Sequence, residues 1–178
     1  MKKSVMLAMA LMLPAFTLSV QAADTQGALT DAEIAHIVVT ANTVDIENGN
    51  LAKKKAANQD VHGYAHRMVA DHTDSNRQAT ELAKKLNVTP KDNAISQSLK
   101  DGAKAGLEKL KGLSGKEFDR AYIDGEIALH KKVIEVADSK LVPNVKNEEL
   151  KALLVKTRPI LVSHLEHAEK IKSAFDQW

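Results

Sequence analysis

Five titratable side chains fall on the apolar faces of four predicted helices. At about 100° per residue, His72, His130 and His164 each lie in the middle of a stripe of aliphatic residues. Glu126 precedes His130 by one turn on the same side, and Asp45 shares the apolar face of its own helix. Counted from the turn that closes each predicted hairpin, these positions lie at similar depths, so we expect them to converge on one interior cluster.

Imidazole and carboxylate groups in this combination are suitable ligands for Zn²⁺, Cu²⁺, Fe²⁺ or Mn²⁺. Burying several of them together is costly unless they are paired or bound to a metal. We therefore predict a site for one transition-metal ion, with Asp45, His72, Glu126, His130 and His164 as ligands. A second interpretation stays open, in which neutral histidines and a carboxyl that shares a proton form a metal-free network that specifies helix packing.

The other polar motifs are weaker candidates. His167 points toward the rim of its helix face, and His62 and His66 at i,i+4 belong to an exposed face. Asp71 points away from the apolar stripe, which indicates a surface carboxylate or one that supports a ligand from outside. No serine lies near the inward histidines, so a Ser-His-Asp triad is not expected. An enzyme whose metal activates water is a third hypothesis, and no substrate is indicated.

Four long amphipathic helices are needed to position these side chains. The apolar spacing predicts them over about residues 30–57, 61–87, 114–141 and 147–171, with a shorter helix over 91–110 in the crossover. No alternation of the kind seen in strands occurs. The sequence therefore predicts an all-α fold of two long hairpins joined by a crossover.

Local signals predict where these helices begin. Capping boxes, in which a Ser or Thr and a Glu three residues later satisfy free amides, predict starts at Thr30 and Ser114. Thr89 followed by a proline predicts the start of the short helix near residue 91. Asn147 is the expected cap of the last helix, and Pro159 is expected to kink it.

Several motifs resemble, in order along the chain, those of the DUF4142 family, a group of exported or outer-membrane bacterial proteins of undefined biochemical function. The motifs are residues 44–52, 65–73, 118–122, Glu126 with His130, 158–159 and 164–167. The resemblance implies a ferritin-like four-helix bundle, here with an extra short helix between the second and third long helices. Its signature positions include Asp45, Asp71, His72, His130 and His164.

The chain departs from the di-iron pattern of ferritin-like proteins, which places Glu-x-x-His at i,i+3 on two helices. Here Glu126 and His130 are at i,i+4, and the helices that carry His72 and His164 lack the motif. Ferroxidase or di-iron oxygen chemistry is therefore not expected, and a single ion is the more natural occupant.

The first 22 residues have the parts of a cleavable signal peptide. Lys2 and Lys3 precede an apolar run over residues 5–20, and small residues lead to a cleavage point after Ala22. The run falls short of the roughly 20 apolar residues that a spanning helix needs. We therefore expect residues 23–178 to form a single domain in the periplasm, with no membrane span.

Cleavage also changes the charge of the chain. Loss of two lysines lowers the 25 Lys and Arg residues to the number of acidic residues, 23. A neutral chain with 3% aromatic residues lacks the basic stripe and the stacking surface that nucleic-acid binding uses, so nucleic acid is not an expected partner. With zero Cys, thiolate ligands and thiol redox chemistry are also excluded. The functions that remain are metal handling, protection against envelope stress, or a metal-free envelope protein that acts through its surface.

Overall fold

The computed structural model describes residues 28–175, and within this range every regular element is a helix. The long helices are α1 (Asp31–Lys55), α2 (Gln59–Lys85), α4 (Gly115–Val136) and α6 (Glu148–Phe175). The crossover from α2 to α4 contains α3 (Ala94–Lys111), while a π-helical turn, η1 (Ala137–Leu141), and the short α5 (Val142–Asn144) lead from α4 to α6. The predicted all-α class is confirmed. The predicted signal peptide, residues 1–22, lies outside the described residues.

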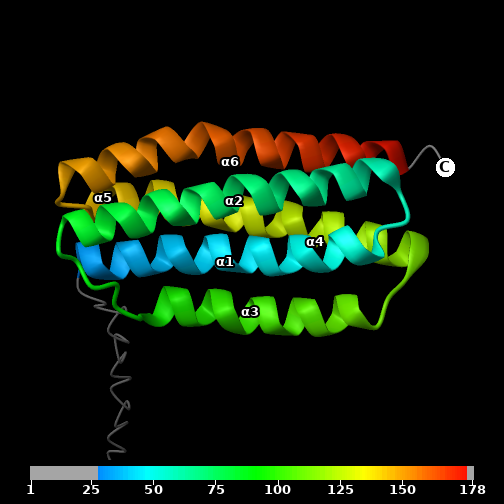
Figure 1. Cartoon of the computed structure of the whole chain (residues 1–178), viewed down its shortest axis with the longest axis horizontal. Helices are drawn as coiled ribbons and strands as arrows, with labels where there is room; N and C mark the ends of the chain where they lie inside the picture. The colour runs from blue at the N-terminus through cyan, green and yellow to red at the C-terminus, as the bar shows by residue number, and fades with distance from the viewer. Residues whose placement is uncertain (1–27, 176–178) are drawn as a thin grey trace, which may run out of the picture.

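Two helical hairpins lie side by side in the molecule (Figure 1). α1 packs along α2, and α4 packs along α6. Contacts of α2 with α6 and of α1 with α4 join the two hairpins, and α3 packs mainly against α1. Among the described helices, none combines the length and the apolar character needed to cross a membrane.

Two of the predicted helix caps are confirmed. At the start of α1, the Thr30 hydroxyl accepts a hydrogen bond from the N–H of Glu33, and the Glu33 carboxylate accepts one from the N–H of Thr30. At the start of α6, the Asn147 Oδ1 atom accepts hydrogen bonds from the N–H groups of Glu149 and Leu150 at 2.9 and 3.0 Å. Both caps satisfy amides that the first helical turn leaves free.

The other two predicted helix starts have different outcomes. α4 begins directly after Ser114, as predicted, but Ser114 makes no side-chain cap hydrogen bond, so the expected capping box is absent; Gly115 begins the helix with a φ of 55°. The predicted start of α3 near residue 91 is wrong: α3 begins at Ala94, because Asn93 provides the cap. The Asn93 side-chain oxygen accepts hydrogen bonds from the N–H groups of Ile95 and Ser96. A Thr-Pro pair is thus a weaker start signal here than the Asn that follows it.

The end of the third long helix also differs from the prediction. α-Helical geometry ends at Val136, and the predicted continuation to residue 141 is the π-helical turn η1. Pro143 follows in α5 and has no N–H with which to continue a helical ladder. In α6, by contrast, Pro159 lies inside the helix without ending it.

Two clusters of buried apolar side chains stabilise the described part of the bundle. One includes Tyr64, Met68, Phe118, Ile123 and Ile171, near the loop between α1 and α2. The other lies toward the opposite end and consists of Ile34, Ile37, Val136, Ala137, Leu141, Val145, Leu150 and Leu154. Along each long helix, the inward histidine or carboxylate lies between residues of these two clusters. The bundle therefore has a polar layer at mid-height, with an apolar core on either side.

Aspartates of two helices hold the loops at opposite ends of the bundle. Asp119 of α4 accepts hydrogen bonds from the N–H groups of Ala57 and Asn58, in the loop between α1 and α2, at 3.1 and 2.8 Å. Asp31 of α1 accepts them from the N–H groups of residues 146 and 147, before α6, at 2.8 and 3.0 Å. Asp119 is 2% exposed, whereas Asp31 is only partly buried. Each carboxylate fixes one hairpin relative to the other.

We expect Asp119→Ala to lower the free energy of unfolding by about 2–4 kcal/mol, because two loop amides lose a buried charged acceptor. The matched change Asp31→Ala removes the same kind of bonds at a site that water reaches, and we expect a loss of about 1 kcal/mol. Urea denaturation followed by circular dichroism measures both values. Equal losses for the two variants would contradict the role of burial.

Candidate metal centre

The helices bring all five predicted side chains into the polar layer. Asp45, His72, Glu126, His130 and His164 come from α1, α2, α4 and α6, and none is more than 3% exposed. Gly49, one turn after Asp45, allows α1 and α2 to pack closely, because a Cβ atom there would lie 2.8 Å from the Val69 side chain. The predicted convergence is thus present in the structure, but the side chains form two groups.

The first group consists of His72, His130 and His164, each of which offers one ring nitrogen, with the three nitrogens within 4.8 Å of one another. The second group consists of Asp45, Glu126 and His130 under the same criterion. His130 belongs to both and therefore lies at the centre of the layer. The three imidazole ring centres are 5.2–5.7 Å apart.

Each histidine of the first group donates a hydrogen bond outward to an oxygen atom. His72 Nδ1 lies 2.9 Å from Asn42 Oδ1, and the Asn42 amide nitrogen in turn donates to Ser75 Oγ at 3.1 Å. His130 Nδ1 lies 2.9 Å from the backbone carbonyl oxygen of Glu126. Because these oxygens only accept, the proton of each neutral ring sits on Nδ1 and the lone pair on Nε2.

His164 has the opposite tautomer. Its Nε2 atom lies 2.8 Å from Asp71 Oδ2, so the proton is on Nε2 and the lone pair on Nδ1. Arg67 also binds the Asp71 carboxylate, with Nε 3.3 Å from Oδ2, and donates to Ser163 Oγ at 3.0 Å. Asp71 thus accepts a hydrogen bond from the outer side of His164, in the position of a carboxylate that supports a candidate ligand from outside.

As a consequence, three lone pairs point into the same space. His130 Nε2 and His164 Nδ1 face each other at 3.4 Å, and neither carries a proton to donate. His72 Nε2 is fully buried and has no hydrogen-bond partner among the described residues. Two acceptors at this distance repel one another unless a positive charge lies between them.

The two carboxylates lie on different sides of the histidines. Asp45 Oδ2 is 3.8 Å from His72 Nε2, the nitrogen that carries the lone pair. Glu126 Oε2 is 3.7 Å from His130 Nδ1, the nitrogen that is already engaged with a carbonyl. Asp45 is therefore placed next to the His72 lone pair, and Glu126 is placed behind the His130 ring.

Burial raises the pKa of Glu126 well above its usual value, and the nearby negative charge of Asp45 raises it further. Burial lowers the pKa of His72, and it lowers the pKa of His164 to about 4 in spite of the Asp71 carboxylate. These shifts favour the protonated form of Glu126, which can donate to Asp45, and the uncharged forms of His72 and His164. Uncharged imidazole is the form that binds metal ions.

Sequence reasoning missed Asn42 and two tyrosines of this layer. Asn42 lies three residues before Asp45 and therefore on the same helix face. A polar residue on this inward face was the signal that could have identified it. Tyr64 and Tyr122 are buried with ring centres 6.2 Å apart, and their hydroxyls have no partner among the described residues. Burial and the charge of Glu126 raise the pKa of both hydroxyls. Because both rings lie on apolar stripes, periodicity did not indicate that their hydroxyls would be buried near Glu126.

The other histidine candidates lie outside the cluster. His167 accepts a hydrogen bond from Arg67 at 3.4 Å and packs against the ring of Tyr64. His62 and His66 are exposed, with ring centres 4.6 Å apart, as the sequence predicted. These three positions provide controls for the buried histidines.

The protonation of Glu126 predicts how stability depends on pH in the metal-free protein. The unfolded chain releases this proton above about pH 4.5 and the folded chain keeps it, so folding loses up to about 1.4 kcal/mol per pH unit as the pH rises toward the folded pKa. Glu126→Gln removes this dependence. Relative to the parent protein in the presence of a chelator, we expect the variant to gain stability steadily from pH 4.5 to pH 7.5. A difference that is constant with pH would show that the buried carboxyl is ionised.

Comparison with known proteins gives a family and no function. The family described as Domain of unknown function (DUF4142) matches residues 17–171, which include all five residues of the polar layer and Asp71. No curated protein and no solved structure matches the chain. The chain therefore belongs to the DUF4142 family, as its motifs indicated.

Proposed function

We propose that the protein binds one transition-metal ion through His72, His130 and His164, with Asp45 as the fourth ligand. The observation that carries the proposal is the contact between His130 Nε2 and His164 Nδ1, two lone pairs 3.4 Å apart. Two nitrogens that bind one ion tetrahedrally at about 2.0–2.1 Å lie about 3.4 Å from each other. The spacing of these atoms is the spacing of neighbouring ligands.

The outer hydrogen bonds support the same assignment. Histidines that bind metals generally donate their second N–H to a carboxylate or a carbonyl, which fixes the tautomer and the ring orientation. His72, His130 and His164 all have such a partner. Imidazole nitrogen with one carboxylate oxygen is a ligand set that suits Zn²⁺, Cu²⁺ or Fe²⁺.

Glu126 has a different role in this proposal from the one that the sequence indicated. It lies on the proton-bearing side of His130, and its own proton makes it a donor to Asp45. We assign it to orienting the Asp45 carboxylate, which leaves four ligands in place of the five predicted. A metal-free network explains the outer hydrogen bonds equally well, but with neutral rings it leaves two acceptor nitrogens in contact and therefore needs an extra proton on His130 or His164.

The cellular setting of the site is also part of the proposal. The basic, apolar and small-residue segments over residues 1–22 support export, which would place the ion site in the periplasm. Two long hairpins with a helix in the crossover support a ferritin-like four-helix bundle. Together these features favour metal handling or protection against metal-related stress in the cell envelope.

Elemental analysis of untagged protein purified from the periplasm tests the proposal. We expect close to one equivalent of a transition metal per chain, and titration of chelator-treated protein with Zn²⁺ or Cu²⁺ to refill the site. His130→Gln and His164→Gln are each expected to weaken binding by more than about 100-fold, because a ligand is lost. The double change His62→Gln and His66→Gln removes two exposed imidazoles and should leave the affinity unchanged.

The metal-free network predicts a different pattern. In that case the protein contains less than about a tenth of an equivalent of any transition metal, and Zn²⁺ or Cu²⁺ gives no rise in Tm. The His130 variant would then lose stability without any change in metal content. This result would overturn the proposed function.

Asp71 gives a second prediction from the same geometry. Asp71→Ala removes the acceptor of the His164 N–H, so we expect metal affinity to fall by about 10–100-fold while the three histidines remain. Asp74→Ala is the matched control, because Asp74 is an exposed carboxylate one turn further along α2 that binds Arg77 and Gln78. Isothermal titration with Zn²⁺ measures both; an equal effect would mean that Asp71 acts only through its charge.

A further inference from the structure

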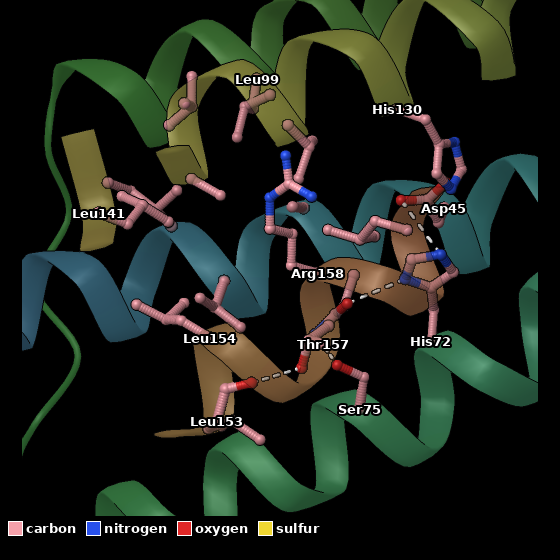
Figure 2. A pocket seen from close by; sticks show the side chains of 18 residues that line it. Asp45, His72, Ser75, Leu99, His130, Leu141, Leu153, Leu154, Thr157 and Arg158 are labelled. Atoms are coloured by element: carbon pink, nitrogen blue, oxygen red, sulfur yellow. Dashed lines mark hydrogen bonds and ion pairs between the residues drawn. The ribbon is translucent and has the colours of Figure 1, made fainter. Parts of the chain in front are cut away.

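An apolar cavity of about 50 Å³ adjoins the polar layer (Figure 2). Asp45, His72 and His130 lie together at one side of it, and Leu141 lies at the opposite side. Most of the remaining wall is aliphatic, with side chains from α1, α3, α4, η1 and α6. The cavity therefore borders the proposed ion site at Asp45, His72 and His130.

The π-helical turn η1 forms part of this wall. Ala137 and Leu141, the first and last residues of η1, both line the cavity, as does Val136 at the end of α4. A π-helical turn inserts an extra residue into an α-helical segment, and such turns are frequent at functional sites. Here the turn occurs where α4 passes the cavity.

Size and polarity limit what the cavity can hold. An apolar cavity of about 150 Å³ stays dry and takes up benzene or xenon, so a space of 50 Å³ suits a molecule of only a few atoms. The one guanidinium on the described wall, that of Arg158, is bound to Asp138 by two hydrogen bonds of 2.7 Å. It is thus already paired and does not offer a free positive charge to an anion.

The wall of the cavity also favours an uncharged ligand. The one guanidinium on the described wall is already paired with Asp138, and the carboxylate of Asp45 lies at the side next to the polar layer. An anion in the cavity would lie against aliphatic side chains with no free cationic side chain to pair with, which is unfavourable. A small neutral molecule meets no such penalty.

We propose that this cavity binds a small uncharged molecule of the size of dioxygen and holds it beside the ion as an additional ligand. The second half of the proposal rests on the proposed function, whereas the first half concerns the cavity alone. A mononuclear site that accepts an external ligand at one position is the arrangement typical of reactive metal centres, and of structural ones only rarely.

Dissolved dioxygen is paramagnetic and therefore reports its own location by relaxing nearby methyl protons in NMR spectra. In zinc-loaded or metal-free protein, we expect relaxation to be several-fold stronger at Ile37, Val136 and Leu161, which line the cavity, than at the control methyls. Val61 and Ile123 serve as controls, because they are buried but belong to the other apolar cluster; Ile37, at 2% exposure, is the matched comparison. Uniform relaxation over both sets would overturn the proposal.

Filling the cavity provides the second readout. Ala41 lines the cavity one turn before Asp45, so Ala41→Leu should abolish the selective relaxation; Ala137→Val serves if that variant does not fold. In Fe²⁺-loaded protein, nitric oxide should bind the ion, and the filled variant should bind it many-fold more weakly at unchanged Fe²⁺ affinity. If the filled variant bound nitric oxide as tightly as the parent protein, ligands would reach the ion by another route, and the proposal would be overturned. Failure to bind any metal, with selective relaxation intact, would instead overturn the proposed function.

Discussion

The contact between His130 Nε2 and His164 Nδ1 is the interaction on which the arrangement of the polar layer depends. It joins α4 to α6 at mid-height, and it places two lone pairs 3.4 Å apart in an interior with little access to water. The outer partners of both rings are oxygen atoms that only accept, so this contact is not an ordinary hydrogen bond while both rings are neutral. A cation bound between the two nitrogens, as we propose, makes the contact favourable and also gives His72 Nε2 a partner.

The rest of the bundle positions this layer with little freedom. Apolar clusters on both sides of it fix the helices along their length, while Asp119 and Asp31 fix the loops at the two ends. Gly49 sets how closely α1 approaches α2, and therefore how close Asp45 comes to His72. At the proposed site, a ligand set held in this way would have its geometry before an ion binds, so binding would not have to order the side chains.

The sequence was sufficient to identify the helices and the inward residues because both follow from periodicity. His72, His130 and His164 are central in their stripes, and equal distances from the hairpin turns place them level. The division of roles within the layer could not be predicted in this way. Whether Glu126 lies in front of the His130 ring or behind it depends on side-chain rotation and on the Asp45 charge beside it, which no spacing encodes. The left-handed conformation of Gly115 and the π-helical turn could not be predicted for a similar reason. Both are backbone conformations adopted within otherwise helical sequence.

The two sides of the layer differ in polarity, and the difference fits the two species that we propose it binds. A groove of about 310 Å³ between α2 and α6 reaches His72 and His164 and is lined by polar residues that include Asp71 and Asp74. A hydrated cation that exchanges its water for imidazole nitrogens needs polar groups along its path, and this groove supplies them. The apolar cavity reaches His72, Asp45 and His130, and its largely aliphatic wall suits a neutral molecule. Because His72 lines both spaces, the ion would lie at the boundary between them, with the charged species on one side and the uncharged ligand on the other.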